Sequence, residues 1–598
     1  MTDLWYGTNG PPNASIVYVA ESWGSEEEAR QQPLVGSSGI ELDRMLAEAG
    51  LDRRSILCTN IIAARPQSNE TWRFFHPKDN VPENEPTIRK LHPTPYARAE
   101  ARRLYDQLAA HPRKLVIGGG NYALWALTSC TNAEPLRSSN NRNISAEEVR
   151  LAPTGIMSWR GSMWYVEPDP AFCSTPETQL ALKGIKFLPT IHPAAILRQW
   201  ELRSVTIHDL KTRVRKALAN DWRRAPEPIV WAPPSFDQAV SKLRQWLTTA
   251  AAGTAVRLSE DIETNSGHIT CIGFADSPHF AMTIPLIRPH PNGSWTSWWT
   301  LDQETVLLRL IRLINSSPHI HIIGQNFIYD TQYIQHWHGV TPHCRHDTML
   351  AQNVMYPGTP KDLGYLSSLY CDYHWYWKDD AKEWDGRGDF LSLLRYNSED
   401  NLRTWEIAES QTQLLSTLNL TNRFNFKMQV HGLCLRMMNR GIRIDKLKRG
   451  EQERELMDIS DQLESQLLEI IPQDWIKPIK KKIDRFWYRS DKQMRTLFYD
   501  LLGFRPVLHP KTKRPTVGKI ALKELHVRYP EFSGLFSRLD KYGSVENTLG
   551  VLQSPLESDG KMRSSLNPGG TETHRLSSSK NAWGRGTNFQ NLTKGDED

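Results

Sequence analysis

Short apolar runs alternate with segments of helical periodicity along the first two thirds of the chain. The runs at 15–20, 56–60 and 115–120 are followed by polar residues or glycine, which predicts buried strands. Residues 39–49 instead space their apolar side chains as one face of a helix. Strands that alternate with helices are typical of a parallel sheet covered by helical layers. We expect this α/β arrangement in residues 1–222, with long polar or Pro-rich loops at 65–95 and 131–170.

A Pro-rich stretch at 224–234 predicts a domain boundary. Beyond it, 271–275 and 319–324 are strand-like, and 306–314 has the wide apolar face of a packed helix. From 416 onward the pattern becomes more helical, with apolar residues at steps of three and four between Leu456 and Ile470. We therefore expect a multidomain α/β protein with domains at 1–222, 228–415 and 416–598, the last mostly helical.

Composition and charge narrow the class of protein. The chain has 598 residues, of which 39% are hydrophobic and 23% charged, which suits about three or four globular domains. From Thr421 to Asp598 there are 32 Lys and Arg against 22 Asp and Glu, a net +10, so the other residues sum to −4 within the total of +6. The basic end is the expected surface for a polyanion such as DNA.

The sequence also predicts the compartment. No apolar stretch approaches the length of a membrane span, and the start lacks a basic region followed by an apolar one. Seven scattered cysteines form no C-x-x-C, and an odd number cannot complete a disulfide framework. We expect a cytoplasmic protein with reduced thiols and no membrane partner.

Four acidic residues are the main candidates for chemistry. Asp261 and Glu263 alternate in a strand-like segment, which places both carboxylates on one face. Asp330 and Asp400 follow in two further segments. Mg²⁺ prefers oxygen ligands, and two such ions can activate water and stabilise the leaving oxygen of a phosphodiester. A D-x-E pair alone is also common on solvated strands, so the other two segments carry much of this interpretation.

Three motifs in this order, D-x-E at Asp261 and Glu263, N-x-x-x-D at Asn326 and Asp330, and Y-x-x-x-D at Tyr396 and Asp400, resemble the proofreading exonuclease of family A DNA polymerases. Segments 346–352 and 376–384 look like phage members of that family. The resemblance implies a ribonuclease H-like 3′→5′ exonuclease. Its four acidic residues would bind two Mg²⁺ or Mn²⁺ ions, Tyr396 would position the attacking water, and Asn326 and Thr264 would lie near the 3′ strand.

Segment 439–445 resembles the opening of the family A polymerase domain, whose first helical part is the thumb. Segments 570–579 and 586–592 resemble its primer–template-binding region, which assigns DNA contacts to Arg575, Asn588, Gln590 and Asn591. Two residues depart from that pattern: His574 replaces a usual glycine and Thr593 a usual proline. The catalytic motifs of the palm and fingers would follow Asp598, so we expect polymerisation to need a second fragment that carries them.

Residues 15–200 are similar to the uracil-DNA glycosylase superfamily, in segments around Glu21, Asn60 and His192. The resemblance implies that Glu21 assists water attack, Asn60 reads a flipped base and His192 stabilises the departing uracil. Leu34 stands where that family stacks an aromatic side chain on uracil. The cysteines of an iron–sulfur cluster are absent, with none before Cys58, so no such cluster is expected.

Three interpretations follow. The leading one is the N-terminal portion of a phage family A DNA polymerase, acting in the host bacterial cytoplasm on single-stranded 3′ ends and primer–template DNA. An alternative is a stand-alone 3′→5′ DNA exonuclease with a domain that recognises uracil or a modified base. The third is a non-catalytic DNA-binding or assembly subunit, against which the complete acidic set argues.

Overall fold

A computed structural model describes residues 4–77, 81–82, 85–129, 155–290, 292, 294–379, 389–470, 490–509 and 514–591. The chain divides into two compact units, Met1–Asn425 and Phe426–Asp598. The domain boundaries expected from the sequence remain predictions.

In the N-terminal part of the first unit, six strands form one sheet in the order β1-β3-β2-β4-β6-β5. The four central strands are parallel and the two edge strands antiparallel. The strands are β1 (Thr8–Asn9), β2 (Ile16–Ser22), β3 (Ile56–Ile62), β4 (Leu115–Gly119), β5 (Trp164–Tyr165) and β6 (Lys186–Thr190). A parallel centre of this kind agrees with the continuous apolar runs from which the strands were predicted.

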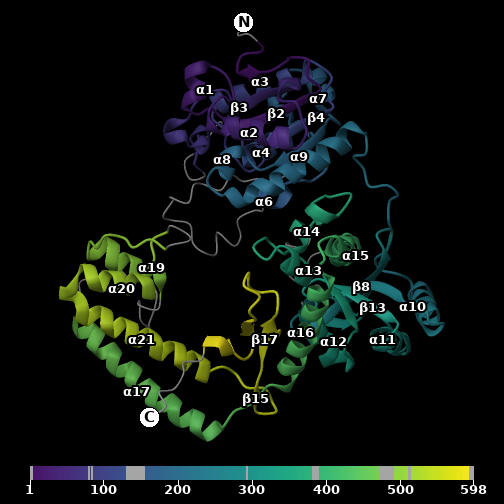
Figure 1. Ribbon diagram of the computed structural model, residues 1–598, viewed down its shortest axis with the longest axis vertical. Helices are drawn as coiled ribbons and strands as arrows, with labels where there is room; N and C mark the ends of the chain where they lie inside the picture. Colours follow the sequence, from purple (N-terminus) through teal and green to yellow (C-terminus); the bar gives the residue numbers. More distant parts are fainter. Residues whose placement is uncertain are drawn as a thin grey trace. The chain divides into compact units, whose positions relative to one another are not determined.

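Alternation along β2 explains the layers on the two faces of this sheet. Val17 and Val19 pack into one apolar cluster, whereas Ile16 and Tyr18 pack into another. Helices α3 (Pro95–Ala109), α4 (Asn121–Leu127) and α7 (Pro176–Leu182) cover the first face. Helices α2 (Ser37–Glu48) and α9 (Arg203–Leu218) cover the second (Figure 1). The sheet therefore lies between two helical layers.

A second sheet in the first unit has the order β14-β13-β8-β9-β10-β7 and mixes parallel and antiparallel pairs. Its strands are β7 (Ile229–Trp231), β8 (Val256–Asn265), β9 (His268–Ser277), β10 (Phe280–Pro285), β13 (Ile320–Gly324) and β14 (Cys344–Asp347). A hairpin, β11 (Ile287–Pro289) and β12 (Trp295–Ser297), extends from it. β8 lies at the centre, where both of its faces are covered.

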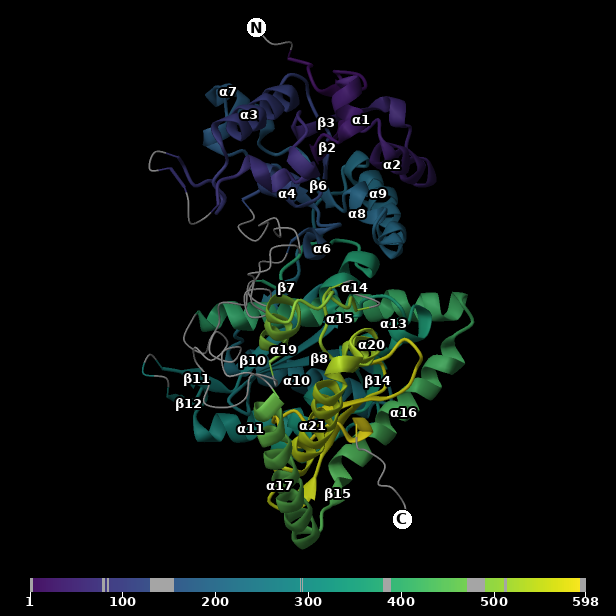
Figure 2. The same cartoon turned by 90° about the vertical axis from the view of Figure 1, so that its left-hand side faces the viewer.

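Opposite faces of β8 meet different helices. Glu260 contacts Asn315 on α11 (Leu301–Ser316), whereas Asp261 contacts Asn397 on α15 (Phe390–Thr417). Figures 1 and 2 show α10 (Phe236–Ala251) beside α11, with α15 across the sheet from them. The remaining helices here are α12 (Ile328–His338), α13 (Thr348–Met355) and α14 (Leu363–Tyr370).

The second unit is mostly helical among its described residues. Helix α16 (Thr421–Arg440) leads into it, and α17 (Lys446–Ile470) packs against α21 (Ser533–Leu552) and α20 (Lys519–Arg528) around one apolar cluster. Short elements complete it: β15 (Ile442–Arg443), α19 (Asp491–Arg495), a π-helix (Thr496–Leu501), β16 (Lys561–Met562), β17 (Ser564–Asn567) and β18 (Ser577–Lys580).

The structure confirms the strands and helices expected from apolar patterning, with bounds that shift by a few residues. The loop expected at 65–95 contains two short 3-10 helices, Gln67–Asn69 and Thr71–Phe74. Within the described ranges, no helix has both the length and the apolar character needed to cross a membrane.

Candidate functional site

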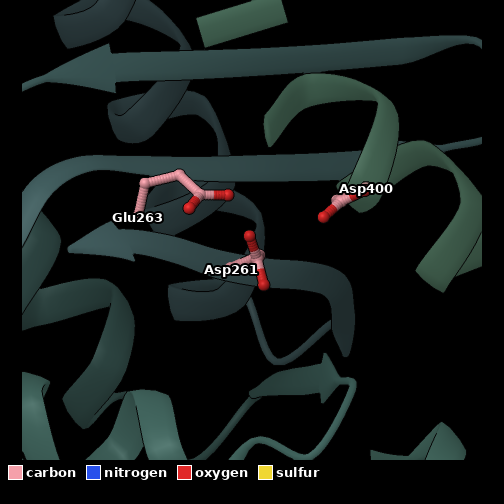
Figure 3. A group of neighbouring side chains, drawn as sticks. All are labelled: Asp261, Glu263 and Asp400. Carbon is pink, nitrogen blue, oxygen red and sulfur yellow. The ribbon is translucent and has the colours of Figure 1, made fainter. Parts of the chain in front are cut away.

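Three carboxylates converge at the centre of the second sheet. Asp261 and Glu263 extend from β8 on the face toward α15, and Asp400 extends from α15 itself. One carboxylate oxygen from each residue lies within 4.8 Å of the other two (Figure 3). The period-2 alternation of the strand places the first pair, and the helix brings the third from 137 residues along the chain. Among the described residues, these three carboxylates form the one group of at least three Asp, Glu, Cys or His side chains that are close enough to share a metal ion.

Polar neighbours hold two of these carboxylates in place. Asn397 Nδ2 donates to Asp261 Oδ2 at 2.7 Å. Trp377 Nε1 donates to Asp400 Oδ1 at 2.6 Å, and Lys378 Nζ contacts Asp400 Oδ2 at 2.5 Å. The sequence motifs did not reveal these three neighbours, although Trp377 and Lys378 lie in segment 376–384, which carried part of the family resemblance.

Burial and mutual repulsion favour protonation of the cluster when no cation is bound. Burial, followed by the charge of Asp400, raises the pKa of Asp261 to about 8, and Lys378 and Asn397 oppose the shift. Burial and the charge of Asp261 raise the pKa of Glu263 well above its usual value. Burial also raises the pKa of Asp400, against the opposing charge of Lys378. A divalent cation would remove this penalty by neutralising the carboxylates.

Tyr396 lies one helical turn before Asp400, as the Y-x-x-x-D spacing predicts. Its hydroxyl accepts a hydrogen bond from Lys378 Nζ at 2.8 Å. Burial, followed by the charges of Asp400 and Glu263, raises the pKa of Tyr396 far above its usual value. The phenol therefore stays protonated and can donate its hydrogen to a water or a substrate oxygen.

The N-x-x-x-D motif has a different geometry from one continuous helix. Helix α12 begins at Ile328, and Asn326 precedes it with a left-handed backbone (φ +53°). Asp330 is 4% exposed, and its Oδ1 accepts from the amide of Ile262, the residue between Asp261 and Glu263, at 3.0 Å. It therefore holds β8 in place but is not one of the three carboxylates that lie within 4.8 Å of one another. Thr264 Oγ1 lies 2.9 Å from the hydroxyl of Tyr329.

The donor set fits a hard divalent cation. Carboxylate oxygens are the ligands that Mg²⁺ and Mn²⁺ prefer, and three of them lie within reach of one ion. The pKa values of Asp261 and Glu263 are raised by burial and by the neighbouring carboxylates, and a bound cation would oppose both shifts. Asp261, Glu263 and Asp400 are therefore the residues that would hold a metal ion.

A second group of predicted residues lies at the carboxyl edge of the first sheet. Glu21 is near the end of β2, Asn60 pairs with Ala20 across β2 and β3, and His192 follows β6. Ligands of open parallel sheets bind outside the carboxyl ends of the strands. The topology therefore brings these three side chains to one edge.

Two buried polar atoms at this edge are available to a ligand. Asn60 is 2% exposed, and among the described residues neither its Oδ1 nor His192 Nε2 has a hydrogen-bond partner. His192 Nδ1 accepts from the amide of Ala194 at 3.2 Å, which assigns the ring proton to Nε2. Burial, with a smaller effect of Arg198, lowers the pKa of His192 to about 4, so the ring is neutral at pH 7. The edge thus presents one buried acceptor and one buried N–H donor.

Glu21 is held by the start of α4. Burial raises its pKa to about 7, while the amides of Tyr122 and Asn121 and the charge of Arg198 oppose the shift. Gly120 is required beside it, since a Cβ there would come within 2.3 Å of Glu21 Oε1, and its φ is +96°. The departure at Leu34 is a buried side chain on a left-handed backbone (φ +54°).

The residues assigned to primer–template contacts lie near the β17–β18 hairpin of the second unit. Arg575 is exposed in the connection between the strands, whereas Gln590 Nε2 donates to Leu576 O at 2.7 Å and Asn588 Oδ1 accepts from the amide of Gln590. His574 has φ +62°, the backbone region that glycine adopts without strain, which agrees with the glycine usual there. The side chain of Asn591 and the residue Thr593 lie outside the described residues.

Residues 8–219 match the family model described as the uracil DNA glycosylase superfamily. A type-4 uracil-DNA glycosylase of Thermotoga maritima is 24% identical over 205 residues, which cover 34% of this chain and 77% of that protein. That of Archaeoglobus fulgidus is 40% identical over 60 residues, or 10% of this chain and 30% of that protein. That of Sulfurisphaera tokodaii is 38% identical over 61 residues, which span 28% of that protein. The chain therefore carries a uracil-DNA glycosylase superfamily domain in its N-terminal part.

Among solved structures, the polymerase domain of Pol1 from M. smegmatis, in complex with DNA primer–template and dNTP, is similar to a larger part of the chain. The match covers 61% of this chain and 56% of that one, with 16% sequence identity and a TM-score of 0.39.

Proposed function

We propose that this protein is a metal-dependent 3′→5′ DNA exonuclease joined to a glycosylase-superfamily domain. The observation that supports the exonuclease is the convergence of Asp261, Glu263 and Asp400 within 4.8 Å. The order of the three motifs supports the family A polymerase relationship that the sequence suggests. Segments 346–352 and 376–384, which look like phage members of that family, support the proposed phage origin. Four residues at or beside this cluster, Asp261, Glu263, Asp330 and Asp400, are the proposed metal-site residues for two Mg²⁺ or Mn²⁺ ions.

Bound Mg²⁺ or Mn²⁺ supplies the activation of water and the stabilisation of the leaving 3′-oxygen. The chain's own residues orient the reaction. Asp330 fixes the strand that carries Asp261 and Glu263, and Asn397 fixes the Asp261 carboxylate. Tyr396, which stays protonated, donates a hydrogen bond to the attacking water. Asn326 and Thr264 are proposed to lie along the frayed 3′ strand.

Digestion of a labelled single strand tests this proposal. With a 5′ label and Mg²⁺, the wild-type protein should give a ladder that shortens from the 3′ end. Asp261→Asn with Glu263→Gln, which keep the side-chain shapes, should abolish the ladder. The matched control is Asp276→Asn, a carboxylate on β9 that pairs with Lys242 away from the cluster. Wild-type protein that leaves the 5′-labelled strand at full length at every Mg²⁺ and Mn²⁺ concentration would contradict the proposal.

The N-terminal domain supports a second candidate function, recognition and excision of uracil from DNA. The specific observation is the pair of unpartnered buried atoms, Asn60 Oδ1 and His192 Nε2, in a domain whose relatives include type-4 uracil-DNA glycosylases. A flipped base is read by hydrogen bonds at its edge, and an N–H donor suits the oxygen of a departing uracil anion. Glu21 is proposed to assist the water that attacks the sugar.

Release of free uracil from a single-uracil oligonucleotide tests this activity without reference to the exonuclease, because EDTA can be present throughout. His192→Ala should abolish release. Binding of uracil-containing DNA without release would place the domain as a recognition module instead.

We also propose that the second unit binds primer–template DNA through Arg575, Asn588, Gln590 and Asn591. DNA synthesis would then require palm and fingers elements, for which a second polymerase fragment is the proposed partner. Binding of a primer–template duplex, weakened by Arg575→Ala and by salt, tests the DNA contact.

A further inference from the structure

The side chain of Lys378 places its ammonium group beside the carboxylate cluster. Lys378 Nζ lies 2.5 Å from Asp400 Oδ2 and 2.8 Å from the hydroxyl of Tyr396, so one ammonium bridges a proposed metal ligand and the proposed water-positioning phenol. The same ammonium lies 4.7 Å from the centre of the Tyr396 ring. Of Trp377 and Lys378, whose side chains both contact the Asp400 carboxylate, Lys378 is the one that carries a positive charge.

The neighbouring Trp377 fixes the direction from which Lys378 approaches. Trp377 is 4% exposed, and the Arg403 guanidinium lies 5.7 Å from its ring centre, with Lys378 Nζ at 5.6 Å. Its indole N–H donates to the other oxygen of Asp400 at 2.6 Å. Consecutive residues therefore engage both oxygens of one carboxylate, which sets its orientation before any metal binds.

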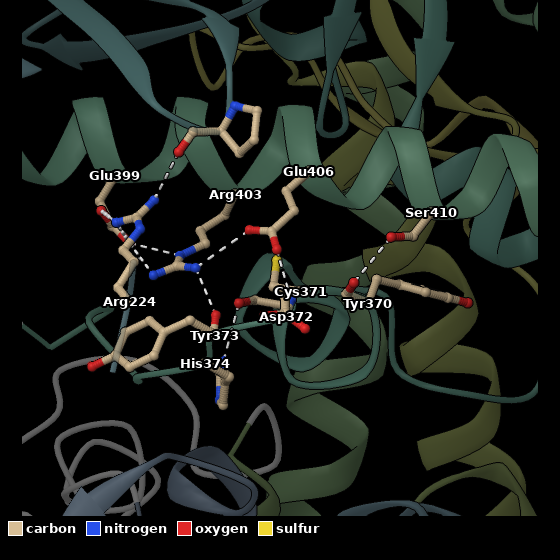
Figure 4. Close-up of polar contacts among 12 residues, drawn as sticks. Arg224, Tyr370, Cys371, Asp372, Tyr373, His374, Glu399, Arg403, Glu406 and Ser410 are labelled. Atoms are coloured by element: carbon tan, nitrogen blue, oxygen red, sulfur yellow. Dashed lines mark hydrogen bonds and ion pairs between the residues drawn. The ribbon is translucent and has the colours of Figure 1, made fainter. Parts of the chain in front are cut away.

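Residues 371–378, which we name the strap, carry Trp377 and Lys378 and have no helix or strand structure of their own. Helix α15 holds the strap from one side: Arg403 Nη1 donates to Tyr373 O at 2.6 Å, and Glu406 Oε1 accepts from the amide of Asp372 at 2.6 Å. Figure 4 shows these contacts along α15, the same helix that carries Asp400.

The glycosylase-superfamily domain holds the strap from the other side. Arg213 on α9 is 2% exposed and donates to the carbonyl oxygens of Asp372 at 2.8 Å and Cys371 at 3.2 Å. The amide of Met163 donates to His374 O at 2.8 Å. Trp375 packs on Trp164 with ring centres 4.4 Å apart. The backbone that presents Lys378 is thus fixed by residues from both parts of the first unit.

We propose that Lys378 is a positioning residue of the exonuclease site that also competes with the metal ion for the negative charge of the cluster. The proposal rests on the proposed exonuclease function. The ammonium fixes the position of the Tyr396 hydroxyl relative to the Asp400 carboxylate, while its charge weakens binding of the metal cation. Its removal should therefore have two effects of opposite sign, tighter metal binding and slower cleavage.

Calorimetric titration of the full chain with Mn²⁺, in the absence of DNA, tests the first effect. Lys378→Met removes the charge and keeps much of the side-chain length, and Lys378→Gln keeps a polar end that can still reach Tyr396. Both variants should bind Mn²⁺ more tightly than the wild type. Lys242→Met is the matched control, since Lys242 pairs with Asp276 at 2.8 Å away from the cluster, and it should leave Mn²⁺ affinity unchanged.

Cleavage of single-stranded DNA at saturating Mn²⁺ tests the second effect. Lys378→Met should lower kcat by about 10²-fold with an unchanged KM for DNA, because small errors in placement of reacting groups are costly. Lys378→Arg, which keeps the charge, should retain wild-type Mn²⁺ affinity. Unchanged or weaker Mn²⁺ binding in both neutral variants would overturn the proposal. A wild-type protein that binds Mn²⁺ but cuts no DNA would contradict the exonuclease instead, and the binding comparison would still decide the role of Lys378 in cation affinity.

Discussion

At the carboxyl edge of the first sheet, Asn60 Oδ1 and His192 Nε2 have no hydrogen-bond partner among the described residues, whereas at the carboxylate cluster Asp261 and Asp400 are contacted from several sides. The first arrangement leaves an acceptor and a donor for a neutral, planar ligand. The second leaves excess negative charge that a lysine offsets in part. The edge of the first sheet offers unpartnered hydrogen-bonding atoms and the cluster carries excess negative charge, so the two sites should respond to different ligands.

The largest expected effect is loss of cleavage when the cluster is neutralised. Asp400→Asn should lower the exonuclease rate by about 10³-fold or more, because an anionic metal ligand and the carboxylate oxygen that pairs with Lys378 are lost together, while Asn Oδ1 can still accept from Trp377. Uracil release in EDTA should stay at the wild-type rate. Parallel assays on both substrates measure this, and a fall in both activities would show that the sites are not separable.

The strap links the two sites physically, and Arg213 tests that link. Arg213→Met leaves the carbonyls of Ser368, Cys371 and Asp372 without a donor, which should destabilise the first unit by about 3 kcal/mol. Exonuclease activity should also decrease at temperatures at which the variant is still folded, because the strap carries Lys378. The exposed Arg223, changed to Met, is the control and should alter neither the melting curve nor the cleavage rate. A destabilised variant with full exonuclease activity would contradict the linking role.

Sequence patterning predicted the secondary structure well because apolar periodicity depends on local burial. It also placed Asp261 with Glu263 on one strand face and Tyr396 with Asp400 on one helix. It missed Lys378, Trp377 and Asn397, since their roles depend on how the strap and α15 approach β8. Short motifs record spacing within an element, whereas these contacts join residues such as Asp261 and Asn397 across 136 positions.

The irregular backbone at Asn326 was missed for a related reason. Side chains four residues apart share one face of a helix, but Asn326 takes a left-handed conformation and the helix begins two residues later. Asparagine tolerates that conformation better than most residues, which was the available signal. The packing of α9 on the strap had no signal in the sequence, because Arg213 resembles any other basic residue of an amphipathic helix.

A smaller effect is expected when stability is measured as a function of pH for the wild type and for Glu21→Gln. The folded pKa of Glu21, about 7, lies above the usual 4.5, so the folded state binds the proton more tightly and loses stability as pH rises from about 4.5 to 7. Glu21→Gln should match the wild type at pH 4 and exceed it by about 2 kcal/mol at pH 8, with partial exposure limiting the gain. Denaturation at both pH values in EDTA measures this. A difference that does not change with pH would show that Glu21 ionises normally.

The smallest expected effect is a trade between stability and binding at Asn60. Asn60→Leu removes a buried acceptor that has no partner and keeps a similar volume, so it should stabilise the first unit by about 1 kcal/mol. The same change should weaken uracil-DNA binding about tenfold, because the base loses its hydrogen-bond partner. Asn581→Leu is the contrasting control: the Nδ2 of the buried Asn581 donates to Glu557 at 2.8 Å and its Oδ1 accepts from the amides of Trp583 and Arg585, so its loss should destabilise. Melting and uracil-DNA binding of the two variants decide the point. If Asn60→Leu destabilises as Asn581→Leu does, Asn60 supports the fold as a packed polar residue, and the edge of the first sheet loses its distinction from the carboxylate cluster.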